Sequence, residues 1–312
     1  MPLDLPAPNL RPDAPALRLG HLPLMDAAPL LVAEAKGMFR AVGLRVALDP
    51  ETAWAALRDR LALGALDGAH LLAPLALALA GGAGGVRAEL SIGCTLSANG
   101  NGIFLSAAAL SGGLRPGARF GIVHPFSAHH VLLRRWLERQ GLRDATLVAA
   151  PPPAMAGLVA AGELDGFCAG APWPAAAEAA GLGRVVAGTA EVWPDHPEKV
   201  LAFRADRRRE VALAATAAVL AAGRWLNEDA NRAEALALLR DRLFPGMPQV
   251  VLASAFDATH RMRFVPGTDR AAAALFLPDL PPMDPSAALA PWDRCLEAQA
   301  GARLSTPTES PV

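Results

Sequence analysis

The stretch Leu164–Trp173, LDGFCAGAPW, decides the fold that this sequence predicts. Its apolar residues 166–169 predict a buried strand, which ends at Gly170 and leads through Pro172 directly into a helix. Such a joint leaves backbone N–H groups of the first helical turn without partners inside the helix. Free N–H groups at the start of a helix attract anions. We therefore expect this joint to form part of an anion-binding site.

A closely similar phrase occurs earlier in the chain, at Leu66–Pro74, LDGAHLLAP. It has the same order of an acidic turn, an apolar strand, a proline and a helix. Two copies of the phrase indicate two lobes of similar build, facing each other and closing on a small anion. Both phrases also fit the ordinary strand-to-helix joints of any α/β protein, and their form alone does not separate the two interpretations.

Length and composition narrow the classes of function. The 312 residues are enough for two lobes with separate cores, and a net charge of −1 without a basic stripe argues against direct nucleic-acid binding. The cysteines Cys94, Cys168 and Cys295 are far apart and lack metal-ligand spacing, so we expect core thiols, no metal and no cofactor. The first twenty residues lack the apolar core of a secretion signal, and no later run predicts a membrane span. If Met1 is the natural start, we expect a cytoplasmic protein.

Predicted strands alternate with predicted helices along the first 200 residues, which indicates parallel βαβ units and an α/β fold. The chain would pass between the lobes near residues 98–102 and 195–203, where loops could act as hinges. The expected segments are a flexible arm (1–15), a first lobe (16–98 with 204–303), a second lobe (99–203) and a disordered tail (304–312).

Polar side chains gather at the predicted strand ends and helix starts, where open α/β sheets bind ligands. They are Trp54, His70, Asn99, Asn101, His124, His129, His196 and Lys199. Lys199 would supply a positive charge, His129 a donor, and Trp54 a flat wall with an indole N–H. Each also has a plainer explanation, as a surface lysine, a helix cap or a core tryptophan.

We find no catalytic pattern in the sequence. HPFSAHH at residues 124–130 lacks the His-Glu-x-x-His spacing of zinc hydrolases, and the glycines at 81–85 lack the lysine of a phosphate-binding loop. The sequence therefore favours a binding protein over an enzyme. Asp26, just before Pro29, is interpreted as the N-cap of the first helix, and Ser127 as the cap of the helix that begins at residue 128.

The opening LRLGHLPLMDAAPLLVAEAKGMFRAVGLRVAL (17–48) resembles the nitrate-, bicarbonate- and sulfonate-type periplasmic binding proteins. The residues that carry this resemblance are Gly37, Phe39, Gly43, Leu44 and Val46. Six further motifs, in the same order, narrow it to the nitrate-binding branch: AWAALRDRL (53–61), LDGAHLLAP (66–74), SANGNGI (97–103), HPFSAHHVLLRRWL (124–137), APPPAMAGLVAAGELDGFCAGAPW (150–173) and VWPDHPEKVLAFRAD (192–206). The resemblance covers roughly residues 17 to 240.

The resemblance implies a two-lobe, class II periplasmic-binding-protein fold, with mostly parallel sheets flanked by helices and nitrate or nitrite in the cleft. By motif position it places the binding residues at Trp54, Asn101, His129, Gly170 and Lys199. Asn101 stands where the transport proteins of the branch have Gln. His70 and Asn99 complete the expected set because of their places at strand ends.

The expected cytoplasmic location favours the NasS-like nitrate sensors of this branch. That resemblance implies a partner, the RNA-binding antiterminator NasT, which the ligand-free sensor holds and releases when nitrate or nitrite binds. The alternative is the extracytoplasmic binding component of a nitrate or bicarbonate ABC transporter. A third interpretation is an enzyme similar to the thiamine-pyrimidine synthases, whose tight cysteine cluster is absent from this sequence.

Overall fold

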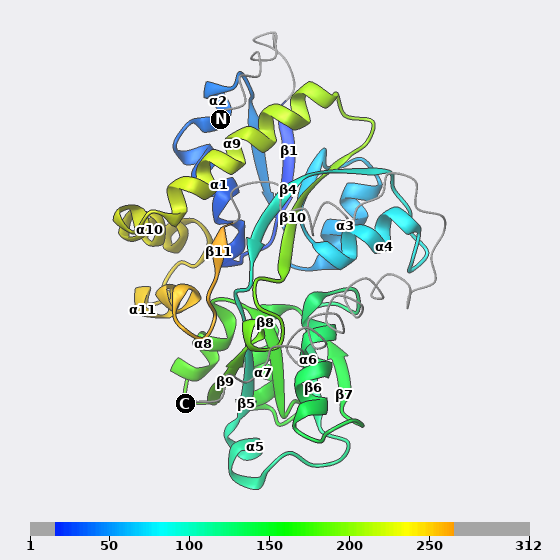
Figure 1. Cartoon of the computed structure of the whole chain (residues 1–312), viewed down its shortest axis with the longest axis vertical. Helices are drawn as coiled ribbons and strands as arrows, with labels where there is room; N and C mark the ends of the chain where they lie inside the picture. Colours follow the sequence, from blue (N-terminus) through cyan, green and yellow to red (C-terminus); the bar gives the residue numbers. More distant parts are fainter. Residues whose placement is uncertain (1–15, 265–312) are drawn as a thin grey trace, which may run out of the picture.

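In the computed structural model, residues 16–264 are described, and they form two β-sheets, one in each of two lobes (Figure 1). The first sheet, in the upper lobe of Figure 1, has six strands within this range. In spatial order they are β11 (Arg263–Phe264), β4 (Leu90–Ala98), β10 (Pro197–Arg204), β3 (Gly68–Leu72), β1 (Leu17–His21) and β2 (Val46–Pro50). The predicted arm 1–15 and tail 304–312 lie outside the described residues.

The second sheet, in the lower lobe, has five strands among the described residues. They are β7 (Thr146–Ala149), β6 (Arg119–Ile122), β8 (Gly166–Gly170), β5 (Asn101–Ser106) and β9 (Gly183–Gly188). The two similar sequence phrases form β3 and β8, which hold equivalent places: each pairs in parallel with one neighbour and antiparallel with the other.

Both sheets are mixed, whereas the sequence predicted mostly parallel ones. β1 is parallel to β2 and β3, and β6 is parallel to β7 and β8, as βαβ units require. The antiparallel pairs all involve β4, β5, β9, β10 and β11. Four of these strands flank the two passages of the chain between the lobes. A strand that arrives from the other lobe enters its sheet from the opposite end, and sequence periodicity carries no sign of this.

Helices cover the faces of both sheets (Figure 1). Beside the first sheet lie α1 (Ala28–Ala35), α2 (Met38–Ala41), α3 (Trp54–Ala62), α4 (Ala73–Gly81) and α9 (Arg209–Asn227). Outside this layer, α10 (Arg232–Leu243) packs against α1 and α9, and α11 (Gln249–Ala253) packs against α10. Beside the second lie α5 (Ala107–Gly112), α6 (Ala128–Arg139), α7 (Pro152–Ala160) and α8 (Trp173–Ala179). The 3₁₀ turns are η1 (Met25–Ala27), η2 (Thr189–Glu191), η3 (Asp229–Asn231) and η4 (Ser254–Phe256). Ser127 caps α6 as predicted, accepting the N–H of His130.

The two passages between the lobes lie side by side. The first runs from Ala98, the end of β4, to Asn101, the start of β5, and its link adopts positive φ angles of 59° at Asn99 and 90° at Gly100. The second runs from β9 through η2 to β10, so residues 197–203, which the prediction assigned to the second lobe, pair with strands of the first sheet. The Asn99 amide donates to Asp195 Oδ1 at 3.3 Å and so joins the two passages.

The lobes touch around a continuous apolar core. Buried side chains of the first lobe, Leu24 and Trp54 among them, belong to one cluster with Phe104 and Phe167 of the second. The N–H of Met25 donates across the interface to the carbonyl of Ala171 at 3.1 Å. This contact places η1 of the first lobe directly against Ala171, the residue that follows β8.

Candidate functional site

Lys199 on β10 lies at the centre of a charged cluster buried between the sheets. Its side chain has no solvent exposure, and its Nζ lies 2.9 Å from Asp26 Oδ2 and 2.8 Å from Glu198 Oε1. Burial by itself would lower the pKa of Lys199, but the two carboxylates outweigh it and raise that pKa above its ordinary value. Lys199 is therefore a permanent positive charge held away from water.

A β-bulge brings Glu198 and Lys199 into the same cluster. Successive residues of a regular strand point to opposite faces of the sheet. The pairing of β10 with β4 shifts register between Pro197 and Lys199, and again between Lys199 and Val200. An extra residue of this kind redirects a side chain, and bulges are common next to functional sites. As a result, both side chains contact each other at the interface between the lobes.

The first lobe contributes three more side chains around Lys199. Asp26, in η1, accepts a hydrogen bond from His70 Nε2 at 2.8 Å in addition to its contact with Lys199. The indole of Trp54, at the start of α3, lies 5.5 Å from the His70 ring and 5.5 Å from Lys199 Nζ. The burial of Asp26 opposes its ionisation, but Lys199 and His70 overcome this and hold its pKa below the usual range. Asp26 is therefore an ionised partner of Lys199.

The second lobe closes the cluster around Glu198. Asn101, the first residue of β5, donates to Glu198 Oε2 at 2.7 Å. His129, in the first turn of α6, places its Nδ1 3.4 Å from Glu198 Oε1, and His196 places its Nδ1 3.4 Å from Oε2. The far nitrogen of His196 lies 2.8 Å from the hydroxyl of Thr189. We call these seven residues the ionic cluster: Asp26, His70, Asn101, His129, His196, Glu198 and Lys199.

Several polar atoms of this region have no hydrogen-bond partner among the described residues. They are Trp54 Nε1, His70 Nδ1, Asn101 Oδ1, His129 Nδ1 and His196 Nδ1, all on side chains at most 2% exposed. Buried polar atoms are nearly always paired, because leaving one unpaired costs about 1–3 kcal/mol. So many unpaired nitrogens around one buried lysine indicate a site arranged for a polar ligand.

Two histidines of the cluster, His129 and His196, are neutral near pH 7. Burial lowers the pKa of His129 to about 4, although Glu198 opposes the shift, and burial likewise lowers the pKa of His196. Burial opposes the ionisation of Glu198, but Lys199 and the two histidines outweigh it and keep its pKa below the ordinary value. One lysine therefore faces two carboxylates, and Asp26, Glu198 and Lys199 together carry a formal charge of −1 (−1 −1 +1).

The predicted site residues fall into two groups in the structure. His70, Asn101, His129 and Lys199 belong to the ionic cluster, and Trp54 covers it. Gly170, at the end of β8, borders it: a Cβ added there would lie 3.5 Å from Asn101 Oδ1 and 3.9 Å from Asp26 Oδ2. Asn99 lies apart, with its amide bonded to Asp195 and to the carbonyl of Arg261. The role of all these residues in ligand binding stays a prediction.

Two local details differ from the sequence interpretation, one at the joint after β8 and one at the start of α1. The Ala171 N–H is not free to bind an anion, since it donates to the carbonyl of Gly100 at 2.9 Å. Asp26 is not the N-cap of α1: Ala27 holds that position, and within the described chain α1 has no side-chain cap. The charged side chains that the structure gathers between the lobes are those of the ionic cluster.

Sequence reasoning missed Asp26 and Glu198. Asp26 does follow the carboxyl end of β1, the same signal that singled out the other candidates, but the nearby Pro29 favoured its interpretation as a cap. Glu198 gave no signal, because a neighbour of Lys199 on a regular strand would face away from it. Only the bulge in β10 places it in the cluster.

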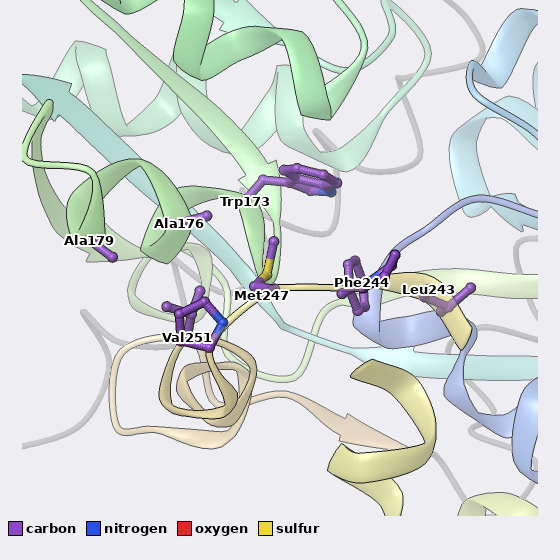
Figure 2. A pocket seen from close by; sticks show the side chains of 9 residues that line it. Trp173, Ala176, Ala179, Leu243, Phe244, Met247 and Val251 are labelled. Atoms are coloured by element: carbon purple, nitrogen blue, oxygen red, sulfur yellow. The ribbon is translucent and has the colours of Figure 1, made fainter. Parts of the chain in front are cut away.

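A separate apolar groove of about 390 Å³ lies between α8 and the segment from α10 to α11 (Figure 2). Trp173, Phe244, Met247 and Val251 line it, and no member of the ionic cluster does. Among residues 16–264, no group of three His, Cys, Asp or Glu side chains is arranged to hold a metal ion. In the same range, no helix combines the length and the apolar character needed to span a bilayer.

The two lobes with mixed sheets, two adjacent passages of the chain and a polar cluster between the sheets define a periplasmic-binding-protein fold. The fold matches the crystal structure of the periplasmic nitrate-binding protein NrtA from Synechocystis PCC 6803 with a TM-score of 0.77, over 96% of this chain and 91% of that one, at 23% identity. A family model for the NMT1-like family matches residues 11–240. The chain belongs to the NMT1-like family.

Curated relatives are similar in sequence over most of this chain. The bicarbonate transport ATP-binding protein CmpC of Synechococcus elongatus is 36% identical over 75% of this chain and 38% of its own length. The nitrate/nitrite binding protein NrtA of the same species is 34% identical over 70% of this chain and 57% of its own. The chain thus spans well under two thirds of the length of these relatives.

Replacing Trp54 with phenylalanine should weaken the binding of a small anion by roughly two- to tenfold, the worth of one ordinary hydrogen bond. Phenylalanine keeps an aromatic wall but removes the unpaired Nε1–H. Trp173→Phe is the matched control, because the Trp173 indole donates to the carbonyl of Pro23 outside the ionic cluster. Titration calorimetry with nitrate measures both variants. Equal affinities in Trp54→Phe and the wild type would remove the indole N–H from the site.

Proposed function

We propose that the chain is a binding protein for a small planar anion of the nitrate, nitrite or bicarbonate type, held between the lobes at the ionic cluster. The observation that carries the proposal is the fully buried Lys199 surrounded by unpaired ring nitrogens from both lobes. A lysine ammonium is a strong point charge, and indole and imidazole N–H groups are donors. The names of the relatives, which include nitrate- and bicarbonate-binding proteins, support this choice of ligand.

A binding role is better supported than a catalytic one. Burial raises the pKa of Cys94 to about 12 and that of Cys168 well above its usual range, so both remain thiols near neutral pH and are poor nucleophiles. Cys295 lies outside the described residues. None of the seven residues of the ionic cluster carries a hydroxyl or a thiol, and the Thr189 hydroxyl, which lies 2.8 Å from His196 Nε2, is fully buried.

Titration calorimetry of the full chain with nitrate, nitrite, bicarbonate and sulfate tests the proposal. We expect saturable binding of one planar monoanion per chain and weaker binding of the tetrahedral, doubly charged sulfate. The proposal fails if none of the three planar anions binds at any pH between 6 and 8.

At a finer level, we extend the proposal to a cytoplasmic, NasS-like sensor that holds a NasT-like RNA-binding antiterminator until nitrate or nitrite binds. The sequence resemblance to the sensors supports it. The paired passages suit a sensor and a transport protein equally, because in both an anion that contacts both lobes favours their closed arrangement. The competing role is that of a binding component for an ABC transporter, which the relatives' names suggest.

A pull-down of the full chain with a NasT-like antiterminator separates these two roles. For a sensor, the complex should form without anion and dissociate when nitrate or nitrite is added. Linkage requires the reverse effect as well, so the regulator should weaken nitrate binding by the same factor, typically about 5- to 150-fold. The sensor role would be ruled out if neither nitrate nor nitrite dissociates the complex, or if the chain binds only a membrane permease.

A further inference from the structure

The carboxylate of Glu198 occupies the centre of the donors that an anion would need. Its Oε1 faces Lys199 Nζ at 2.8 Å and His129 Nδ1 at 3.4 Å. Its Oε2 faces Asn101 Nδ2 at 2.7 Å and His196 Nδ1 at 3.4 Å. Four nitrogen atoms from three segments of the chain therefore converge on one planar, singly charged group.

A carboxylate and a planar oxyanion such as nitrate or nitrite present the same chemistry to these donors. Both are flat, both carry one negative charge, and both accept hydrogen bonds through oxygen atoms. Lys199 and Asn101, two of the residues predicted to bind the anion, already contact Glu198. An external anion and the ionised Glu198 side chain would thus compete for the same donors.

The net negative charge of Asp26, Glu198 and Lys199 also disfavours the binding of an anion without a compensating proton. Asp26, Glu198 and Lys199 together carry −1, and a bound monoanion would bring this total to −2 in a region almost without solvent exposure. Uncompensated charge in such a region is strongly unfavourable. Taking up one proton restores the total of −1.

The groups that face Glu198 from each neighbouring element are few. Lys199 on β10 is positive, while His196, before β10, and His129, on α6, are neutral near pH 7. Cys168 on β8 is a neutral thiol, and Asn101 on β5 has no charge. Asp26 in η1, which also holds His70 of β3, lies across Lys199 and adds a second negative charge to the region. Both carboxylates contact Lys199, but of the two it is Glu198 that also accepts the hydrogen bond of Asn101.

Building on the proposed function, we propose that Glu198 is a built-in competitor of the anion, and that a small planar monoanion binds together with a proton taken up by the Glu198 carboxyl group. The proton removes the competing charge and turns the carboxyl group from an acceptor into a donor toward the anion. The affinity for nitrate then depends on pH even though nitrate itself does not titrate in this range.

Calorimetry of the full chain with sodium nitrate at pH 6, 7 and 8, in two buffers that differ in ionisation enthalpy, measures proton uptake directly. For the wild type we expect about one proton per nitrate and an affinity that falls about tenfold per pH unit. Glu198→Gln keeps the size of the side chain but has no charge to displace. It should bind nitrate at least about tenfold more tightly than the wild type at pH 8, with little dependence on pH.

Asp26→Asn is the matched control, because it removes the other carboxylate that contacts Lys199 and leaves Glu198 on its donors. Its net charge no longer requires a proton, so if it still takes up one proton per nitrate, as we expect, the cause is the competition of Glu198 for the donors. Equal behaviour of the two variants would overturn the role of Glu198 and leave only an effect of net charge. The wild-type proton count remains decisive if Glu198→Gln does not fold. Nitrate binding without proton uptake overturns this inference but leaves the proposed function intact, whereas no binding by the wild type or by either variant overturns both.

Discussion

Replacing Lys199 with alanine is expected to abolish anion binding and to lower the free energy of unfolding by about 3–5 kcal/mol. The loss of stability follows from the two carboxylates left behind, because Asp26 and Glu198 are fully buried and both depend on Lys199 for a positive partner. Removing one partner of a buried ion pair leaves an uncompensated charge, which costs far more than the loss of an exposed pair.

Urea unfolding at pH 7.5, followed by circular dichroism, measures the change in stability, and calorimetry with nitrate measures binding. Lys36→Ala is the matched control, since Lys36 pairs with Glu234 at 2.6 Å on the surface, with side-chain exposures of 31% and 62%. It should change stability by at most about 1 kcal/mol and leave binding unchanged. If the two alanine variants unfold at the same urea concentration, Lys199 does not neutralise the buried carboxylates.

The free energy of unfolding is expected to fall as the pH is lowered from about 6.5 toward 4. Burial lowers the pKa values of His21, His124 and His129 from 6.5 to about 4, and burial also lowers that of His196. Between these pH values the unfolded chain binds protons that the folded chain excludes, so acid favours unfolding. Each histidine contributes up to about 1.4 kcal/mol per pH unit.

The carboxylates act in the same direction at lower pH. Asp26 and Glu198 have lowered pKa values in the folded chain, so their stabilising effect is present above the unfolded-state pKa and is lost as the pH falls through the folded one.

Urea unfolding at half-unit steps from pH 7.5 to 4.5 gives the profile. His124→Asn removes one titrating group outside the ionic cluster, and its Oδ1 can still accept the N–H of Phe126 that His124 Nδ1 accepts at 3.0 Å. The variant should show a shallower decline, and a wild-type stability that stays constant or rises between pH 6.5 and 5 would contradict the burial of neutral histidines.

Sequence patterns predicted the elements with strong local signals. The repeated phrase at Leu66–Pro74 and Leu164–Trp173 forms equivalent central strands, because an apolar run between an acidic turn and a proline has few other solutions. The two-lobe α/β class followed from this repetition and from the family resemblance. The sequence did not predict the mixed direction of the strands, because β10 pairs with β3 and β4, which lie far from it in the chain.

The candidate site was predicted only in part, for a similar reason. Asn101 and His129 lie at the starts of β5 and α6, a position that sequence can indicate. Lys199 lies near the start of β10 and His70 in the middle of β3, and the structure brings all four together. The charge state of the cluster could not be predicted, because it depends on a bulge in β10 and on the contact of η1 with Lys199. The sequence shows no partner for Lys199, whereas in the folded chain the carboxylates of Asp26 and Glu198 both contact it.

A crystal structure of the full chain grown with nitrate would show where the anion binds. We expect one nitrate between the lobes, in contact with Lys199 Nζ and with nitrogen donors from both lobes, while Glu198 gives up part of its contacts to Lys199 and Asn101. An interlobe region without nitrate at saturating concentration, with the Glu198 carboxylate still on all its donors and the anion bound elsewhere, would contradict this expectation.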